Sequence, residues 1–436
     1  MSTNHRDQMS RGRWLHRHVS DLAEWSGMTV RALNEIVEGV ARVKGRDAAQ
    51  FVRQHGVQCL HEAIDASDFG PLRDYVLEQL RQPLLAMAVS VGRKFLGWDG
   101  DFYVDDYLVL RINFPYEVAR RAKVSTENPG SGRLSPPVRA AYNARKIIDP
   151  VFDAKSYHGD NPPAAWAHGP HRDSWTGHSR DGRNIWWAIG DVPAEASIVF
   201  YPETGEDSLP CDPRTLYLQA GYPVPKSTCQ PMAAGEMLIF DPELLHATHL
   251  NTTNMTRVAI SVRLNASKPT FDPSCFYARE FWRRASEIER GEDKVHFLRR
   301  EDNLGPPVVA KSIEPRGVLP RIAGVIDPTT GAVRSIPGEA VTVARRVIVE
   351  VPPYRVMVVR TKDGLLAYDA ACPHNGADLA DGGCDEDNIY CPACAVSFDM
   401  LTGRSSCEAL TLRSHEVWEA DGAIQIRIIS RGTAAA

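Results

Sequence analysis

The feature that most restricts the fold is a series of short apolar runs in the middle of the chain. Starting at Tyr107, these runs read YLVLRINF, NIWWAI, ASIVFY, TLYLQA, EMLIFD and RVAISVRL. They are separated by proline, glycine, asparagine and aspartate, the residues that favour turns. Several short strands joined by turns are typical of a β-sandwich or a β-barrel. The sequence therefore predicts a mainly β core over this region.

A region of helical spacing precedes these runs, from about residue 14 to residue 95. Segment 21–40, DLAEWSGMTVRALNEIVEGV, suits either a DNA-binding helix-turn-helix or a plain pair of helices that caps the next domain. Few basic residues lie near this segment, and the chain has a net charge of −5. We therefore expect N-terminal helices that cap the β core, and nucleic acid is not an expected partner.

The length of 436 residues exceeds what one hydrophobic core usually organises. We expect a helical N-terminal extension at 1–45, a main domain at 46–300, a linker at 301–340 and a second β domain at 341–430. The linker is predicted from the run GPPVVAKSIEPRGVLPRIAG, which is rich in proline and glycine. The chain begins with polar and basic residues and contains no stretch of about 18 apolar residues. We therefore expect no signal peptide, no membrane segment and a cytoplasmic protein.

Three residues in the main domain have the chemistry of an iron site. The sequence HGPHRDSW places His171 and Asp173 two residues apart, so that on a strand both side chains face the same way. A later segment, GEMLIFDPELLHATHLN, offers His246 or His249 as a third ligand. Two imidazoles and one carboxylate leave three coordination positions open on one side of Fe(II), where a co-substrate and O2 can bind.

The second of these segments resembles the phytanoyl-CoA dioxygenase-like oxygenases. Their pattern of Gly-acidic, an apolar strand, a ligand His, an Asn and an Arg falls on Gly235, Glu236, His246, Asn251 and Arg257. In that family the arginine binds the far carboxylate of 2-oxoglutarate, a task that suits a planar guanidinium group. Arg257 lies at the family's usual interval after His246, whereas pairing His249 with Arg257 or Arg263 does not fit as well.

This resemblance implies a double-stranded β-helix, or jelly roll, with Fe(II) bound by His171, Asp173 and His246. Arg257 would bind 2-oxoglutarate, and Thr248 and Trp187 are further candidates for contact with that co-substrate. A plain strand threonine and a core tryptophan are the alternatives for the last two. The implied activity is hydroxylation or desaturation of a C–H bond in a small-molecule substrate. Because a carboxylate ligand is present, no position is left for a halide.

Five of the nine cysteines lie in the last quarter of the chain, at positions 372, 384, 391, 394 and 407. In a chain without a secretory signal, such a cluster indicates metal binding rather than disulfides. The segment CPHNGADLADGGCDEDNIYCPACAVSFDMLTG resembles Rieske domains, whose pattern is C-x-H followed by C-x-x-H. Cys372, His374 and Cys391 match that pattern, and Cys394 replaces the final histidine. The resemblance implies a small Rieske-like β domain with a [2Fe-2S] cluster held by these four residues, although three thiolates and one imidazole also suit zinc.

The role of this second domain stays open at the level of sequence. A Rieske oxygenase that feeds electrons to its own catalytic iron needs a different ligand pattern, which the sequence lacks. A cluster beside a 2-oxoglutarate site could re-reduce the iron, accept electrons from a ferredoxin reductase, or act as a docking scaffold. The alternative to an oxygenase is a non-catalytic ligand or redox sensor, or an electron carrier, in which the jelly roll only binds its ligand.

Overall fold

The computed structural model describes residues 14–121, 133–134, 168–202, 209–212, 216–219, 222, 224, 227–273, 280–305, 321–326, 333–337, 346–384 and 387–429. The chain divides into two compact units, and residues 219–227 group with the second of them. The first unit comprises residues 1–218 and 228–311, and the second comprises residues 219–227 and 312–436. No helix in the described ranges is long and apolar enough to cross a bilayer.

The described part of the first unit begins with a strand, which corrects the prediction that the helical region starts near residue 14. β1 (Trp14–His18) pairs antiparallel with β8 (Glu236–Phe240). The helix-turn-helix interpretation is also wrong, because its first helix is replaced by a short 3-10 turn at Ala23–Trp25. The helices that follow are α1 (Met28–Lys44), α2 (Arg46–His55), α3 (Leu60–Ala63) and α4 (Phe69–Lys94).

Two β-sheets contain the described strands of this unit. Strands of the large sheet are, in spatial order, β1, β8, β5 (Gly182–Ala188), β10 (Arg257–Asn265), β2 (Tyr103–Asp105), β11 (Phe281–Arg284) and β12 (His296–Phe297). The same sheet includes β3 (Tyr107–Asn113), which pairs with β10, and β4 (Arg133–Leu134), which pairs with β3. A small sheet contains β7 (Thr228–Cys229), β6 (Ile198–Phe200) and β9 (His246–Thr248). The predicted jelly roll is confirmed, and five of the six apolar runs form strands. The sixth run, TLYLQA, shows only a single β-bridge at Leu218 in its described part.

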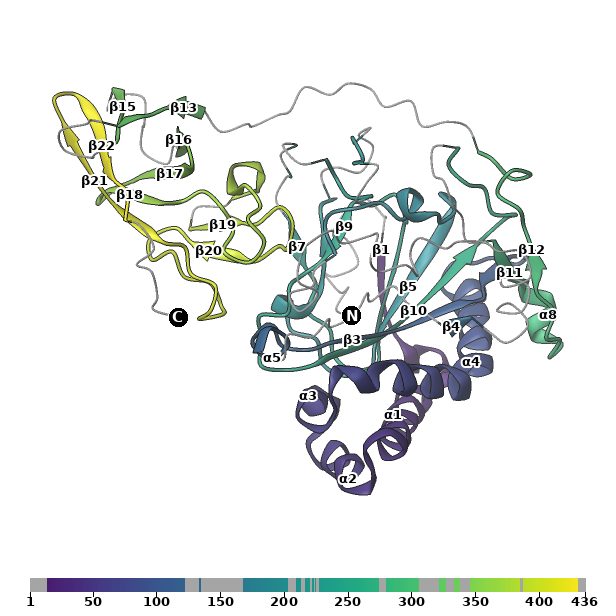
Figure 1. Ribbon diagram of the computed structural model, residues 1–436. Coiled ribbons are helices and arrows are strands. Elements are labelled where there is room, and N and C mark those ends of the chain that lie inside the picture. The colour runs from purple at the N-terminus through teal and green to yellow at the C-terminus, as the bar shows by residue number, and fades with distance from the viewer. Residues whose placement is uncertain are drawn as a thin grey trace, which may run out of the picture. The chain divides into compact units, whose positions relative to one another are not determined.

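The large sheet buries both of its faces, and each face has a different partner. Alternate residues of β10, such as Val258 and Ile260, join the core formed with α1, α2 and α4, and Figure 1 shows these helices beneath the sheet. Residues on the other face, such as Ala259, pack with Phe200 of the small sheet. Because side chains alternate along a strand, this arrangement assigns every second residue to the space between the two sheets.

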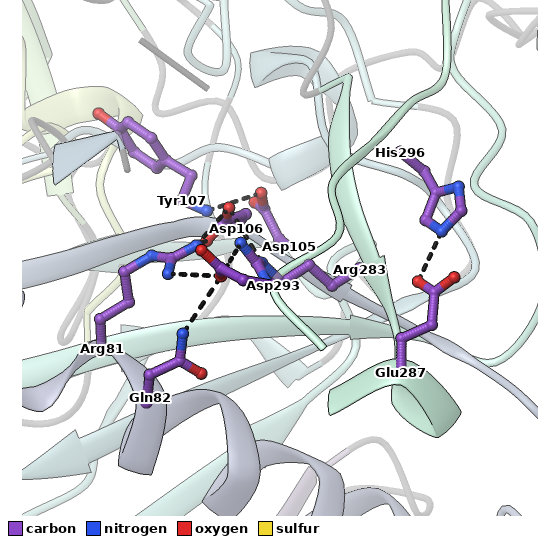
Figure 2. Close-up of polar contacts among 9 residues, drawn as sticks. All are labelled: Arg81, Gln82, Asp105, Asp106, Tyr107, Arg283, Glu287, Asp293 and His296. Carbon is purple, nitrogen blue, oxygen red and sulfur yellow. Dashed lines mark hydrogen bonds and ion pairs between the residues drawn. The ribbon is translucent and has the colours of Figure 1, made fainter. Parts of the chain in front are cut away.

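A buried ionic network ties α4 to the far edge of the large sheet (Figure 2). Asp106 accepts two hydrogen bonds of 2.8 Å from Arg81 of α4. The same carboxylate lies 3.1 Å from Arg283 of β11, whose side chain is 1% exposed. Arg283 also contacts Asp293 at 2.7 Å. Buried ion pairs of this kind hold only when each charge is compensated, so the network fixes how the helix packs against the sheet.

The second unit is a small β domain. Its main sheet has the order β13 (Arg321–Ala323), β16 (Arg346–Val351), β17 (Tyr354–Thr361), β18 (Gly364–Asp369), β21 (Ser414–Ala420), β22 (Ala423–Arg427), β15 (Val333–Pro337) and β14 (Val325–Ile326). A separate hairpin consists of β19 (Asn388–Tyr390) and β20 (Ser397–Asp399). Valine and isoleucine side chains from β16, β17 and β22 fill the core. The turn of this hairpin carries Cys391 and Cys394, whereas Cys372 and His374 follow β18, and none of the four belongs to this core.

Candidate metal centres

The three predicted iron ligands come together in the first unit. His171 and His246 face each other across a β-bridge, with backbone N–H···O distances of 2.9 and 3.0 Å. The sequence predicted that His171 and Asp173 lie on one strand. Asp173 instead begins a 3-10 turn at Asp173–Thr176. Its Oδ1 lies 3.6 Å from Nε2 of His171 and 3.7 Å from Nε2 of His246. All three side chains are buried, so this is an enclosed group of two imidazoles and one carboxylate.

Backbone carbonyls hold both imidazoles in one orientation. Nδ1 of His171 lies 2.7 Å from the oxygen of Gly169, and Nδ1 of His246 lies 2.8 Å from the oxygen of Leu244. A carbonyl only accepts, so each Nδ1 carries the proton and each Nε2 has its lone pair available for a metal. Burial, together with the charge of His171, lowers the pKa of His246 to about 3. That imidazole is therefore neutral, as ligation requires.

The second oxygen of Asp173 has its own partners. Asn184 of β5 donates from Nδ2 to Oδ2 at 2.6 Å, and Nε of Arg263 lies 3.5 Å from the same oxygen. Burial by itself would raise the pKa of Asp173, but the charges of Arg263 and of neighbouring histidines keep it well below its usual value. The carboxylate is thus ionised and turned so that Oδ1 points toward the two imidazoles.

These three residues lie in a cavity between the two sheets. The described residues that line it are Arg111, His168, His171, Asp173, Asn184, Ile185, Trp186, Ile198, Phe240, His246, Thr248, Ser261 and Arg263. Predicted Thr248 is among them. His168 contacts the cavity as well, and its Nδ1 lies 2.6 Å from the hydroxyl of Tyr217.

Arg257 lies beside the cavity but is not one of its lining residues. Its guanidinium carbon is 5.8 Å from the ring centre of Trp186, and Nη1 donates to the oxygen of Ala196 at 3.0 Å. Nε and Nη2 are buried and have no hydrogen-bond partner among the described residues. Burial and the charge of Arg111 lower the pKa of Arg257 to about 9, so it stays cationic at neutral pH. Two unpaired donors on a buried cation fit a carboxylate such as that of 2-oxoglutarate.

The prediction for Trp187 is wrong. Trp187 is fully buried in the core between the large sheet and the helices, and it does not line the cavity. Its neighbour Trp186 faces the cavity instead, because adjacent residues of β5 point to opposite faces. The alternative ligand His249 also lies outside the cavity lining, and its Nδ1 lies 2.5 Å from the oxygen of Leu250.

Sequence reasoning missed Arg111 and left Arg263 without a role in the site. Arg111 donates from Nε to Oγ of Ser261 at 2.8 Å. Burial and the charge of Arg263 lower the pKa of Arg111 to about 10. A signal was present in both cases, because each arginine interrupts an apolar strand, in YLVLRINF and in RVAISVRL. A charged residue on a strand that is buried on both faces indicates a polar cavity.

The cysteine motif also converges in the second unit. Cys372 and His374 follow β18, whereas Cys391 and Cys394 lie between β19 and β20. The Sγ atoms of Cys372 and Cys394 are 3.9 Å apart, and Cys372, His374 and Cys394 offer donor atoms within 4.8 Å of one another. Cys391 contacts Cys372. The three thiols are buried, and the structure thus gathers all four predicted ligands.

The electrostatics of these thiols favour a bound cation. Contact with Cys391 and Cys394 lowers the pKa of Cys372, whereas burial raises the pKa of Cys391 and Cys394 well above the usual value. Without a metal, one thiolate therefore suppresses ionisation of the other two. Three buried sulfurs and an imidazole at such short range fit iron or zinc chemically.

Comparison with known proteins finds one family match for each of the two motif regions. The family model "Phytanoyl-CoA dioxygenase (PhyH)" matches residues 133–259, and the family model "Rieske [2Fe-2S] domain" matches residues 330–414. No curated protein matches the chain.

Among solved structures, the ferredoxin of carbazole 1,9a-dioxygenase from Nocardioides aromaticivorans IC177 is 27% identical. That match covers 22% of this chain and 95% of the ferredoxin, with a TM-score of 0.20. A Sphingomonas yanoikuyae B1 ferredoxin is also 27% identical, and the match covers 20% of this chain and 89% of that one, with a TM-score of 0.19.

The PhyH match spans His171, Asp173, His246 and Arg257, and the family implies Fe(II) and 2-oxoglutarate. The Rieske match spans the cysteine motif and implies a [2Fe-2S] cluster. The chain is therefore an oxygenase-type enzyme in which a phytanoyl-CoA dioxygenase domain is joined to a Rieske [2Fe-2S] domain.

Proposed function

We propose that this protein is an Fe(II)/2-oxoglutarate-dependent oxygenase that hydroxylates or desaturates a C–H bond of a small-molecule substrate. His171, Asp173 and His246 would hold the iron. Bound Fe(II), with 2-oxoglutarate and O2, supplies the oxidising power and releases succinate and CO2. The catalytic unit would span residues 46–300 together with the N-terminal residues from Trp14, since β1 is part of the same sheet.

The observation that carries this proposal is the way in which Nε2 of His171, Nε2 of His246 and Oδ1 of Asp173 point toward one common centre. Metal ligands about 2.1 Å from an ion and at right angles to one another are about 3 Å apart. The 3.6 and 3.7 Å separations are close to this value and too long for strong hydrogen bonds. Fixed Nδ1–H groups and a carboxylate held at Oδ2 are the supports that a metal site needs.

The protein side of the co-substrate site would consist of Arg257, Thr248 and Trp186. Arg257 offers two unpaired N–H donors to the far carboxylate of 2-oxoglutarate, and the Trp186 ring lies against its guanidinium group. Thr248 is two residues beyond His246 on β9 and so faces the same way. Its hydroxyl would donate to the same carboxylate.

The second unit contains the predicted domain at 341–430 and also β13, β14 and β15, which lie within the predicted linker at 301–340. For this unit we propose that Cys372 and Cys391 hold one iron of the cluster. His374 and Cys394 would hold the other. The cluster supplies one-electron transfer, and a ferredoxin reductase is the class of partner that would reduce it. Because 2-oxoglutarate supplies two electrons itself, the cluster would serve to return an inactive, oxidised catalytic iron to the ferrous state.

Turnover assays on the full-length protein test this function. Formation of succinate from 2-oxoglutarate should require both Fe(II) and O2. Asp173→Ala should abolish it while leaving the visible and EPR signals of the reduced cluster unchanged, because the two centres use separate ligands. Cys372→Ala should abolish the visible and EPR signals of the cluster and leave the initial rate of succinate formation unchanged.

The alternative, a sensor that only binds its ligand, gives a different result. The wild-type sensor would bind Fe(II) and 2-oxoglutarate without forming any succinate. Loss of succinate formation together with the EPR signal of the cluster in Asp173→Ala would contradict the assignment of two separate centres.

A further inference from the structure

The large sheet places three arginines on the face that carries the cavity. Arg257 and Arg263 are six residues apart on β10, and Arg111 of β3 pairs with Ala259 of β10. Residues at even spacing along a strand share a face. Arg111 and Arg263 line the cavity itself, so the site holds more guanidinium groups than one carboxylate needs.

A single 2-oxoglutarate does not account for all three. The backbone positions of Arg257 and Arg263 are about 20 Å apart along β10, and their guanidinium groups have different neighbours, the oxygen of Ala196 for Arg257 and Asp173 for Arg263. The carbon chain of 2-oxoglutarate is only about 5 Å long. If Arg257 binds the far carboxylate, Arg263 lies at the opposite end of β10. There its Nε is 3.5 Å from Oδ2 of Asp173. Asn184 donates to the same oxygen.

The contacts of Arg111 and Arg263 leave room for a ligand. Arg263 is 9% exposed, and its Nη1 has no hydrogen-bond partner within the described ranges. Arg111 uses Nε to donate to Ser261, which lies two residues before Arg263 on the same strand face. Buried N–H donors of a cation are costly to leave unpaired, and an oxyanion satisfies them best.

The charge of the site leads to the same ligand. Asp173 is the one acidic residue among the described lining residues. A ferrous ion and the guanidinium groups of Arg111, Arg257 and Arg263 carry five positive charges, whereas Asp173 and 2-oxoglutarate carry three negative charges. Two positive charges therefore remain in a buried site, where uncompensated charge is strongly unfavourable.

We propose that Arg111 and Arg263, with the Ser261 hydroxyl between them, form a second oxyanion subsite beside the iron. The substrate is then a small molecule that carries a carboxylate or a phosphate. This inference rests on the proposed function, because it assumes that Fe(II) and 2-oxoglutarate occupy the places assigned to them. The oxyanion would hold the substrate so that one particular C–H bond faces the iron.

Calorimetric titration of the full-length protein, loaded anaerobically with Fe(II) and 2-oxoglutarate, tests the subsite. Three probes of similar size are compared: butyrate, propyl phosphate and the neutral butyramide. Butyrate or propyl phosphate should bind at least about tenfold more tightly than butyramide, and the tighter of the two identifies the oxyanion. Arg111→Gln should lose this preference and Arg111→Lys should restore part of it. Arg120→Gln, on the exposed surface of α5 (Tyr116–Arg121), is the matched control.

Affinity for 2-oxoglutarate, measured on the same variants, separates the two proposals. Arg111→Gln should bind 2-oxoglutarate as the wild type does, whereas Arg257→Gln should not. Equal binding of all three probes, or loss of 2-oxoglutarate binding in Arg111→Gln, would overturn the second subsite and leave the oxygenase intact. A wild-type protein that fails to bind Fe(II) or 2-oxoglutarate would overturn the proposed function and the subsite with it.

Discussion

The hydrogen bond from Asn184 to Asp173 leads to a quantitative prediction about iron affinity. Asn184→Ala should weaken Fe(II) binding by about 10- to 100-fold, which corresponds to about 1.4–2.7 kcal/mol. The bond is 2.6 Å long and both residues are buried, and a hydrogen bond to a charged group contributes about 1.5–3 kcal/mol. The expected loss of Fe(II) affinity therefore agrees with the free energy of this one hydrogen bond. Without the amide, Oδ2 keeps only the 3.5 Å contact with Arg263, and the carboxylate can turn Oδ1 away from the imidazoles.

Anaerobic titration of the apo catalytic site with Fe(II) measures this effect directly. The EPR signal of the [2Fe-2S] cluster serves as an internal control in the same sample, since it should not change. Asn34→Ala, an exposed asparagine of α1, is the matched variant and should bind Fe(II) as the wild type does. If Asn184→Ala binds Fe(II) within about twofold of the wild type, the carboxylate does not depend on Asn184 for its orientation, and the account of the site is wrong.

Three further predictions concern other parts of the molecule. Asp106→Ala should lower the unfolding free energy by about 3–5 kcal/mol, because Arg81 and the buried Arg283 lose the buried carboxylate that they share and keep, among the described residues, only Asp293, which is 55% exposed. Denaturant unfolding followed by tryptophan fluorescence would show this loss, and a loss under about 1 kcal/mol would contradict the prediction. Trp186→Ala should weaken 2-oxoglutarate binding, whereas Trp187→Phe should lower only stability, as calorimetry and thermal unfolding can establish. Cys394→His should raise the reduction potential of the cluster, since a neutral imidazole replaces an anionic thiolate; an unchanged potential in voltammetry would remove Cys394 from the ligand set.

Sequence motifs and two family resemblances together predicted both metal centres. The spacing of His171 and Asp173 indicates a metal site without a structure, whereas the choice of His246 over His249, and of a [2Fe-2S] cluster at Cys372 and Cys391, came from the resemblances. The strands were predictable because turn residues bound short apolar runs such as EMLIFD. The ligand residues within one motif are close in sequence, so the motif can be recognised without knowing the tertiary structure.

Tertiary structure decided which face of each strand is inside the site. The motif NIWWAI requires that Trp186 and Trp187 point in opposite directions, but only the packing of helices against Trp187 shows that Trp186 is the one in the cavity. Contacts between residues distant in sequence also could not be predicted from the sequence. An example is the pairing of β1 with β8, which are more than two hundred residues apart. The position of Arg111 beside Ser261 depends on the register between β3 and β10. Alternation along a strand is a local property, whereas the choice of face and partner depends on how the whole chain buries its apolar surface.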